Sequence, residues 1–126
     1  MTSILDTQDW PQELANAASS DEFRRSATEF DGSLALEVGS DTAWFKIYRG
    51  HVIDTEPYVP SFGATFRVIG DDKAWRRVAS GDQSLSGAIH TGSLKTAGNK
   101  LEANRMREML ELLIRTLQDL DEAIDD

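Results

Sequence analysis

The chain has 126 residues, a formal net charge of −9 at pH 7 and no cysteine. A chain of this length is expected to form one domain, residues 1–126, and to bury roughly two-thirds of the surface that its unfolded state exposes. The lack of cysteine excludes disulfides, thiol nucleophiles and thiolate metal ligands. Because the charge is negative and the arginines form no segregated basic cluster in the sequence, nucleic-acid binding is not expected.

The first residues carry no recognisable targeting signal. Residues 1–6 contain no basic region and no long apolar run, and no segment approaches the ~20 apolar residues of a membrane span. The sequence therefore predicts a soluble protein of the cytoplasm, without a transmembrane segment.

Residues 1–30 are expected to contain two helices. Pro11, whose φ is fixed, suits the first turn of one helix, and Ser19 with Glu22 matches the capping box that opens a second. The second helix ends at the Asp31-Gly32 pair, because glycine favours helix termination.

Beyond these helices the apolar period changes from 3.6 residues to two, which indicates β-strands. Leu34, Leu36 and Val38 show this alternation first. The strands expected from such patterns cover residues 34–38, 43–49, 51–56, 64–69 and 93–97. Between the third and fourth strands lies Pro57–Gly63, which is too broken by proline for a central strand and too apolar for an ordinary solvated loop.

Three more helices are expected in the second half of the chain. Asp71 or Asp72 caps the first of them, Gly81 ends it, and a weak short helix follows within residues 82–91. The last helix opens after Asn99, with Glu102 as the reciprocal acid of its cap.

The last helix carries a continuous apolar stripe. Its members are Met106, Met109, Leu110, Leu113, Leu117 and Leu120. Such a stripe marks the face that packs on the rest of the protein. Acidic residues then dominate positions 119–126, which we expect to form a solvated tail at the end of the domain.

This order of elements predicts an α+β fold, in which helices lie over a small sheet with flexible apolar side chains between the layers. The methionine and leucine stripe fits either a filled core or an apolar pocket. An empty pocket of about 300 Å³ would cost about 7 kcal/mol at ~24 cal/mol per Å³, a large part of a typical stability of about 5–15 kcal/mol. Such a pocket should therefore collapse partly or hold a ligand.

No catalytic or metal-binding motif is recognisable. His51 and His90 have no partner at a metal-ligand spacing, and the serines and glycines form neither a nucleophile elbow nor a phosphate-binding loop. No catalytic residue, metal or cofactor is therefore predicted. Asp54 shares the face of its expected strand with Val52, where burial would raise its pKa and make it a base, but an exposed acid on an edge strand explains it equally well.

The residues from Phe66 onward resemble a known family. The matching segments are Phe66–Asp72, Trp75, Gly81, Leu85–Ile89, Gly92–Gly98 and the methionine-rich last helix. Over residues 30–117 this order resembles the sterol carrier protein 2 (SCP2) domain family, and the Gly-x-Leu-Lys-x-x-Gly pattern of Gly92–Gly98 is its best match. The chain looks like a small stand-alone member of the bacterial type.

The resemblance implies a five-stranded, mainly antiparallel sheet with helices packed on one face. It also implies a tunnel between the sheet and the C-terminal helix for a sterol or steroid, a fatty acid or an acyl-CoA, without catalysis and without a cofactor. Carried over by position, the ligand-binding residues are Phe66, Val68, Trp75, Leu85, Ile89, Leu94, Met106, Met109, Leu110 and Leu113. The leading functional hypothesis is that the protein shields this ligand and delivers it to a lipid- or steroid-metabolising enzyme.

The chain departs from the family pattern at three places, one of which is Asn99–Glu102, where the family has a small apolar run after the final strand glycine. It lacks the Ser-Lys-Leu-type terminus of peroxisomal members, so peroxisomal import is not expected. The Pro57–Gly63 segment has no counterpart in the pattern, and it is interpreted either as a loop packed on the core or as a contact for an apolar ligand or another subunit.

Two other functions remain open from the sequence. One is a small cone-shaped isomerase or dehydratase with Asp54 or His51 as its base, although such cones finish on strands and this chain finishes on a helix. The other is a ligand-free interaction module in which the loop around Tyr58 and Phe62 inserts into a partner protein.

Overall fold

The computed structural model describes residues 3–28 and 30–124, apart from the side chains of residues 100–105. In chain order its elements are the 3₁₀ helix η1 (Ile4–Asp6), α1 (Trp10–Ala17), α2 (Asp21–Ala27), β1 (Asp31–Val38), β2 (Asp41–Tyr48), β3 (His51–Glu56), β4 (Phe66–Gly70), α3 (Asp72–Ala79), α4 (Leu85–Thr91), β5 (Leu94–Gly98) and α5 (Lys100–Ile124). Within the described ranges no helix combines the length and the apolar character needed to cross a bilayer.

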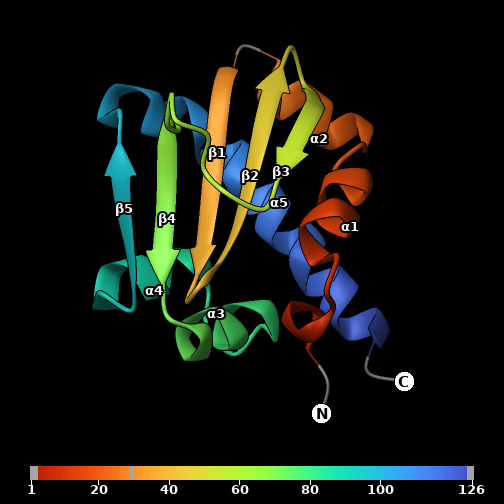
Figure 1. Ribbon diagram of the computed structural model, residues 1–126, viewed down its shortest axis with the longest axis vertical. Helices are drawn as coiled ribbons and strands as arrows, with labels where there is room; N and C mark the ends of the chain where they lie inside the picture. Colours follow the sequence, from red (N-terminus) through yellow and green to blue (C-terminus); the bar gives the residue numbers. More distant parts are fainter. Residues whose placement is uncertain (1–2, 29, 125–126) are drawn as a thin grey trace.

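The five strands form a single sheet in the order β3-β2-β1-β4-β5. Three of the four neighbouring pairs are antiparallel, and the central pair of β1 and β4 is parallel. In Figure 1, α5 runs behind the sheet beside α1 and α2, and α3 and α4 lie at its lower end. The expected fold class, a mainly antiparallel five-stranded sheet with helices on one face, is confirmed.

The core lies between the sheet and the helices. Leu36 on β1 pairs with Ala43 on β2 and with Val68 on β4, so these three side chains point to the same face of the sheet. All three are fully buried, and the buried side of α5 packs against the same layer through Met106 and Met109. Period-two strands and a period-3.6 helix therefore present matching apolar surfaces, as the sequence pattern predicts.

The connection from β3 to β4 crosses the face of the sheet that the helices leave open. Both strands run in the same direction, so the chain must return along the whole sheet between Glu56 and Phe66. Figure 1 shows residues 57–65 passing in front of β2 and β1 on this return. A connection between strands of the same direction usually contains a helix, and between β3 and β4 a proline-containing loop takes its place. We call residues 57–65 the crossing loop and this side of the sheet the open face.

The cap of α2 is one residue later than expected. The Oγ atom of Ser20, and not that of Ser19, accepts a hydrogen bond from the backbone N–H of Phe23 at 3.1 Å. Ser19 instead donates its hydroxyl to the carbonyl oxygen of Asn16 at the end of α1, 3.1 Å away. The prediction that Ser19 caps this helix is therefore wrong, because the Ser19 hydroxyl is bound to the end of α1 and the next serine caps α2. The cap expected from Glu102 at the last helix concerns a side chain outside the described residues.

The acidic residues near the C-terminus differ from the solvated tail that the sequence suggests. Residues 119–124 continue α5, and residues 125–126 lie outside the described part. Asp121 accepts hydrogen bonds from the Ser3 hydroxyl at 3.0 Å and from the Ile4 backbone N–H at 2.8 Å. These acceptors satisfy N–H and O–H groups at the start of η1, so the two ends of the chain are joined by polar contacts.

An ion cluster also joins η1 to α3. The guanidinium of Arg76 contacts both carboxylate oxygens of Asp6 and one oxygen of Asp72, the last at 2.6 Å. The hydrogen bonds from Arg76 and from the Ser3 backbone lower the pKa of Asp6 from 3.8 to about 2. Since the Asp6 side chain is 40% exposed, water and salt screen the interaction.

Replacing Asp6 should give a stability difference that depends on pH. Because the native pKa of Asp6 lies below its unfolded value, its contribution is fully present above about pH 4 and is lost as the pH falls toward about 2. Urea unfolding at a series of pH values should show Asp6→Asn destabilised near neutral pH and converging with the parent chain in acid. Asp82→Asn, in the turn after α3, controls for the loss of one negative charge. A difference that is constant with pH would contradict the ion cluster.

Removing apolar volume at the centre of β1 should be costly. Leu36→Ala should lower the free energy of unfolding by about 2–5 kcal/mol, because a fully buried leucine leaves a cavity. Ile53→Ala, at an exposed position of β3, should change it by less than about 0.5 kcal/mol. Equal losses in urea titrations of the two variants would show that the core is not centred on β1.

Candidate functional site

The residues predicted to bind a ligand come together in the layer between the sheet and the helices. Nine of the ten belong to the buried apolar core, and Ile89 is half-buried and packs against it. They are supplied by β4 (Phe66, Val68), α3 (Trp75), α4 (Leu85, Ile89), β5 (Leu94) and α5 (Met106, Met109, Leu110, Leu113). Elements from residue 66 to residue 113 therefore converge on one apolar layer.

Two features define this layer chemically. Met106 and Met109 are 0% exposed, and methionine is unbranched and repacks more readily than other apolar side chains. Trp75 places its ring in the same layer and donates its indole N–H to the carbonyl oxygen of Glu37 at 2.8 Å. The layer is therefore apolar, and the indole N–H of Trp75 already has an acceptor near the end of β1.

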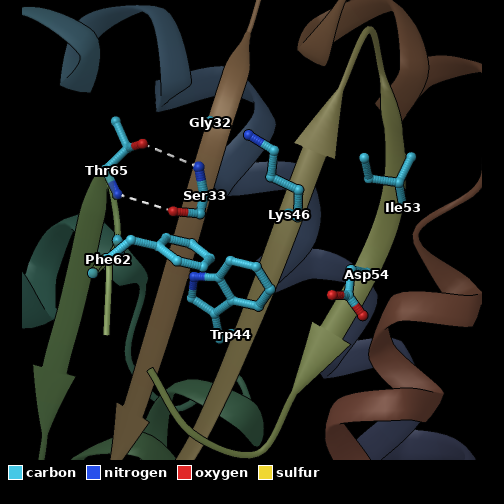
Figure 2. Close-up of a pocket in the computed structure, with 10 residues that line it drawn as sticks. Gly32, Ser33, Trp44, Lys46, Ile53, Asp54, Phe62 and Thr65 are labelled. Atoms are coloured by element: carbon cyan, nitrogen blue, oxygen red, sulfur yellow. Dashed lines mark hydrogen bonds between the residues drawn. The ribbon is translucent and has the colours of Figure 1, made fainter. Parts of the chain in front are cut away.

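A concave cavity of about 580 Å³ lies on the other side of the sheet, beside the crossing loop. Its lining residues are Gly32, Ser33, Trp44, Lys46, Ile53, Asp54, Phe62, Gly63, Ala64 and Thr65. Figure 2 shows them projecting from β1, β2, β3 and the crossing loop toward one hollow. We call this hollow the open-face cavity.

Trp44 forms the floor of the open-face cavity. It alternates with the core residue Phe45, so it points to the open face, where it pairs with Ala35 of β1. Trp44 is only 2% exposed although it lies outside the main core. The ring of Phe62 covers it, with 5.7 Å between the ring centroids and 70° between the ring planes. Phe62 itself is 77% exposed, so the loop shields Trp44 while presenting a second aromatic ring to solvent.

A pair of reciprocal hydrogen bonds holds the end of the crossing loop. The Ser33 backbone N–H donates to Thr65 Oγ1, and the Thr65 backbone N–H donates to Ser33 Oγ, both at 3.1 Å. Gly32 allows this approach, because a Cβ atom there would lie 2.6 Å from Thr65 Oγ1. The Thr65 carbonyl oxygen accepts from the Asn99 N–H at 3.0 Å. The loop is thus fixed to β1 and to the end of β5.

Asp54 points to a different face of the sheet from the one that the sequence predicts. The pairing of β2 with β3 shifts between Lys46 and Ile47, so that Asp54 pairs with Lys46 and Val52 pairs with Ile47. Paired residues point to the same face, so this bulge turns Asp54 to the open face and Val52 to the core face. The expectation that Asp54 and Val52 share a face is wrong, because the bulge at Ile53 breaks the period of two.

Neither histidine lies in the apolar layer. His51 is exposed at the start of the edge strand β3, and His90 is exposed in α4. Among the side chains of the described ranges, no three His, Cys, Asp or Glu residues are grouped as a metal site would require. Neither histidine therefore belongs to a metal site among these side chains.

Sequence reasoning missed the open-face cavity. A usable signal was present in the Ala43–Ile47 segment, where Trp44 and Lys46 occupy the outward positions of an otherwise buried strand. A tryptophan at an outward position indicates that another segment covers it. The apolar Pro57–Gly63 segment is that cover, but only the strand order places it over Trp44.

Comparisons with solved structures give the fold a precedent. A crystal structure of sterol carrier protein 2 is 19% identical and matches with a TM-score of 0.79, covering 91% of this chain and 98% of that chain. A conserved hypothetical protein of Thermus thermophilus, described as a candidate sterol carrier protein, is 19% identical with a TM-score of 0.76 and covers 90% and 87%. A ubiquinone synthesis protein described as UbiJ-SCP2 is 17% identical with a TM-score of 0.57 and covers 97% and 95%.

No protein-family model and no curated protein matches the chain by sequence. At identities below 20%, these likenesses establish the fold. The chain has the SCP2-like fold, and the structural match covers 91% and 90% of the sequence in the first two comparisons.

We call the two hydrogen bonds between Ser33 and Thr65 the clamp, and the effect of removing one of them should be measurable. Thr65→Val keeps the shape of the side chain but removes the acceptor of the Ser33 N–H, which is buried beneath the loop. We expect a loss of about 1–3 kcal/mol in the free energy of unfolding and faster hydrogen exchange at the Ser33 amide. Thr96→Val, on the exposed edge strand, should stay within about 0.5 kcal/mol of the parent chain. Unchanged exchange at Ser33 would contradict the clamp.

Proposed function

We propose that this protein binds a hydrophobic small molecule, a sterol or steroid, a fatty acid or an acyl-CoA, and delivers it to a lipid- or steroid-metabolising enzyme without catalysing a reaction itself. The observation that carries the proposal is the likeness to sterol carrier protein 2, which covers 98% of that chain. The proposed site is the apolar layer between the sheet and α5, lined by the ten residues named above.

The chemistry of the layer supports an apolar ligand. Met106 and Met109 lie one helical turn apart on the buried side of α5 and belong to the same buried cluster as Val68 of β4. Methionine side chains adapt to irregular shapes, which suits a site that receives more than one kind of lipid. Apolar surface removed from water stabilises a complex by roughly 25 cal/mol per Å², without directional contacts.

The ligand-free site is expected to be closed. A void of about 300 Å³ would cost about 7 kcal/mol, comparable with the whole stability of many domains. The complete burial of Met106, Met109 and Leu113 fits a layer in which these side chains fill the space that a ligand would occupy. Binding would then exchange methionine contacts for ligand contacts, so affinity depends on how easily the two methionines repack.

The catalytic alternative has less support. A base in a small isomerase works inside an apolar pocket, where burial raises its pKa. Asp54 and His51 are both exposed on β3, which is an edge strand, and Asp54 points to the open face. Neither side chain can reach a substrate held between the sheet and α5, so the carrier function is favoured.

The two buried methionines allow a direct test of the site. The sequence contains three methionines, so ¹³C-methyl labelling gives three signals, of which Met106 and Met109 report on the proposed site and Met1 is an internal reference. Titration with cholesterol, oleate and oleoyl-CoA should shift the Met106 and Met109 methyl signals and raise the melting temperature. Native mass spectrometry of freshly purified protein should show a retained lipid.

Two matched variants test whether a loss of lipid binding comes from the proposed site or from any polar substitution in α5. Met109→Gln places a polar group in the layer and should weaken lipid binding by about tenfold or more, whereas Leu112→Gln, on a half-buried position of the same helix, should not. If no lipid of the panel stabilises the protein or shifts either methyl signal, the proposed function is wrong.

A further inference from the structure

We propose that the open-face cavity is a second binding site, which takes a small planar aromatic carboxylate. The proposal goes beyond the carrier function, because this cavity lies on the opposite side of the sheet from the apolar layer (Figures 1 and 2). It rests on a buried donor without a partner, a nearby ammonium group and two aromatic rings.

The buried donor is the indole N–H of Trp44. This nitrogen is inaccessible to solvent and no described protein atom accepts a hydrogen bond from it. Burying a donor without a partner costs about 1–3 kcal/mol, and native structures rarely leave such a group unexplained. In Figure 2 the nitrogen lies beside the ring of Phe62, and an N–H contact with a ring is weaker than one with an oxygen. An oxygen that displaced this ring edge would satisfy the donor.

The other polar groups of the wall do not compete for the same oxygen. Ser33 and Thr65 use their backbone N–H groups and side-chain oxygens on each other, which leaves the Trp44 donor as the group that a ligand can satisfy (Figure 2). The same bonds hold the crossing loop in place before a ligand arrives. A wall that is already ordered reduces the entropic cost of binding.

The cavity lining carries one ammonium group, that of Lys46, which lies on the β1 side. Lys46 Nζ is 3.5 Å from Asp31 Oδ1, a long contact, and its side chain is 36% exposed. In Figure 2 its ammonium group points toward β1 and away from Asp54, which lies at the opposite side of the cavity. A carboxylate at Trp44 would gain the neutral donor there and the charged donor once the flexible Lys46 side chain turned from Asp31 toward it, and repulsion from Asp54 would fix the orientation of the ligand.

The remaining walls favour a flat apolar group. Phe62 and Ile53 are exposed and line the cavity, Phe62 over Trp44 and Ile53 on β3. A planar ring placed against them would cover apolar surface and pack against the exposed ring of Phe62. The cavity volume of about 580 Å³ is sufficient for a bicyclic ligand.

The indole signals of the tryptophans provide a site-specific test with 2-naphthoate as the probe. The chain has three tryptophans, and Trp10 and Trp75 lie in the main core, so they serve as internal references. In ¹H–¹⁵N spectra of the whole protein, 2-naphthoate should shift the Trp44 indole signal downfield in a saturable manner and leave that of Trp75 unchanged. Trp44→Phe assigns the signal and should abolish binding.

Substitution of two lysines tests whether the Lys46 ammonium group contributes to binding of the carboxylate. Lys46→Met should weaken 2-naphthoate about tenfold, as expected for a charged hydrogen bond, and should leave neutral 2-acetylnaphthalene unaffected. Lys95→Met is the matched control, because Lys95 pairs with Ile69 on β4 and is exposed outside the cavity. Both lysines are accessible, so these variants remain informative even if Trp44→Phe folds poorly.

Three results would overturn the proposal. The first is a Trp44 indole signal that does not move at millimolar 2-naphthoate, which would leave the Phe62 ring as the partner of the indole. The second is equal binding by the Lys46→Met and parent chains. The third is a shift of the Trp75 indole and Met106 methyl signals in place of Trp44, which would place the probe in the apolar layer and leave the carrier function standing.

Discussion

The parallel pairing of β1 with β4 is the constraint that shapes everything else in the fold. One edge of β1 is occupied by the antiparallel hairpin partner β2, so β4 must take the other edge, and it runs in the direction of β1. After β3 the chain is at the wrong end of the sheet for such a strand. Helices already cover one face, so the return passes over the open face, where residues 57–65 cross it.

This single connection gives the two faces of the sheet different chemistry. The helix-covered face is a closed apolar layer in which Leu36 of β1 and Met109 of α5 belong to one core. The open face is covered only where the crossing loop lies on it, so its tryptophan, Trp44, is buried by Phe62 while polar and charged side chains remain around it. The enclosed apolar layer is the site proposed for a lipid, and the partly covered open face is the site proposed for an aromatic carboxylate.

Polar contacts between distant segments join the helices that cover the sheet to one another. Asp121 of α5 accepts from the start of η1, and Gln118 Nε2 donates to the carbonyl oxygen of Val78 in α3 at 2.9 Å. Arg76 extends the same network to η1 through Asp6. Each contact alone contributes little at the protein surface, but together they hold α5 against η1 and α3.

The order and type of the elements could be predicted from the sequence, because periodicity and caps are local. The strand at His51–Glu56 and the cap at Asp71 follow from neighbouring residues alone, and so does the apolar stripe of α5. Strand order and register, which only the folded chain reveals, set three other features: the face on which Asp54 lies, the cover over Trp44, and the attachment of residues 119–124 to η1. A bulge shifts register by one residue, and a crossing loop joins segments far apart in sequence, so no local pattern records either.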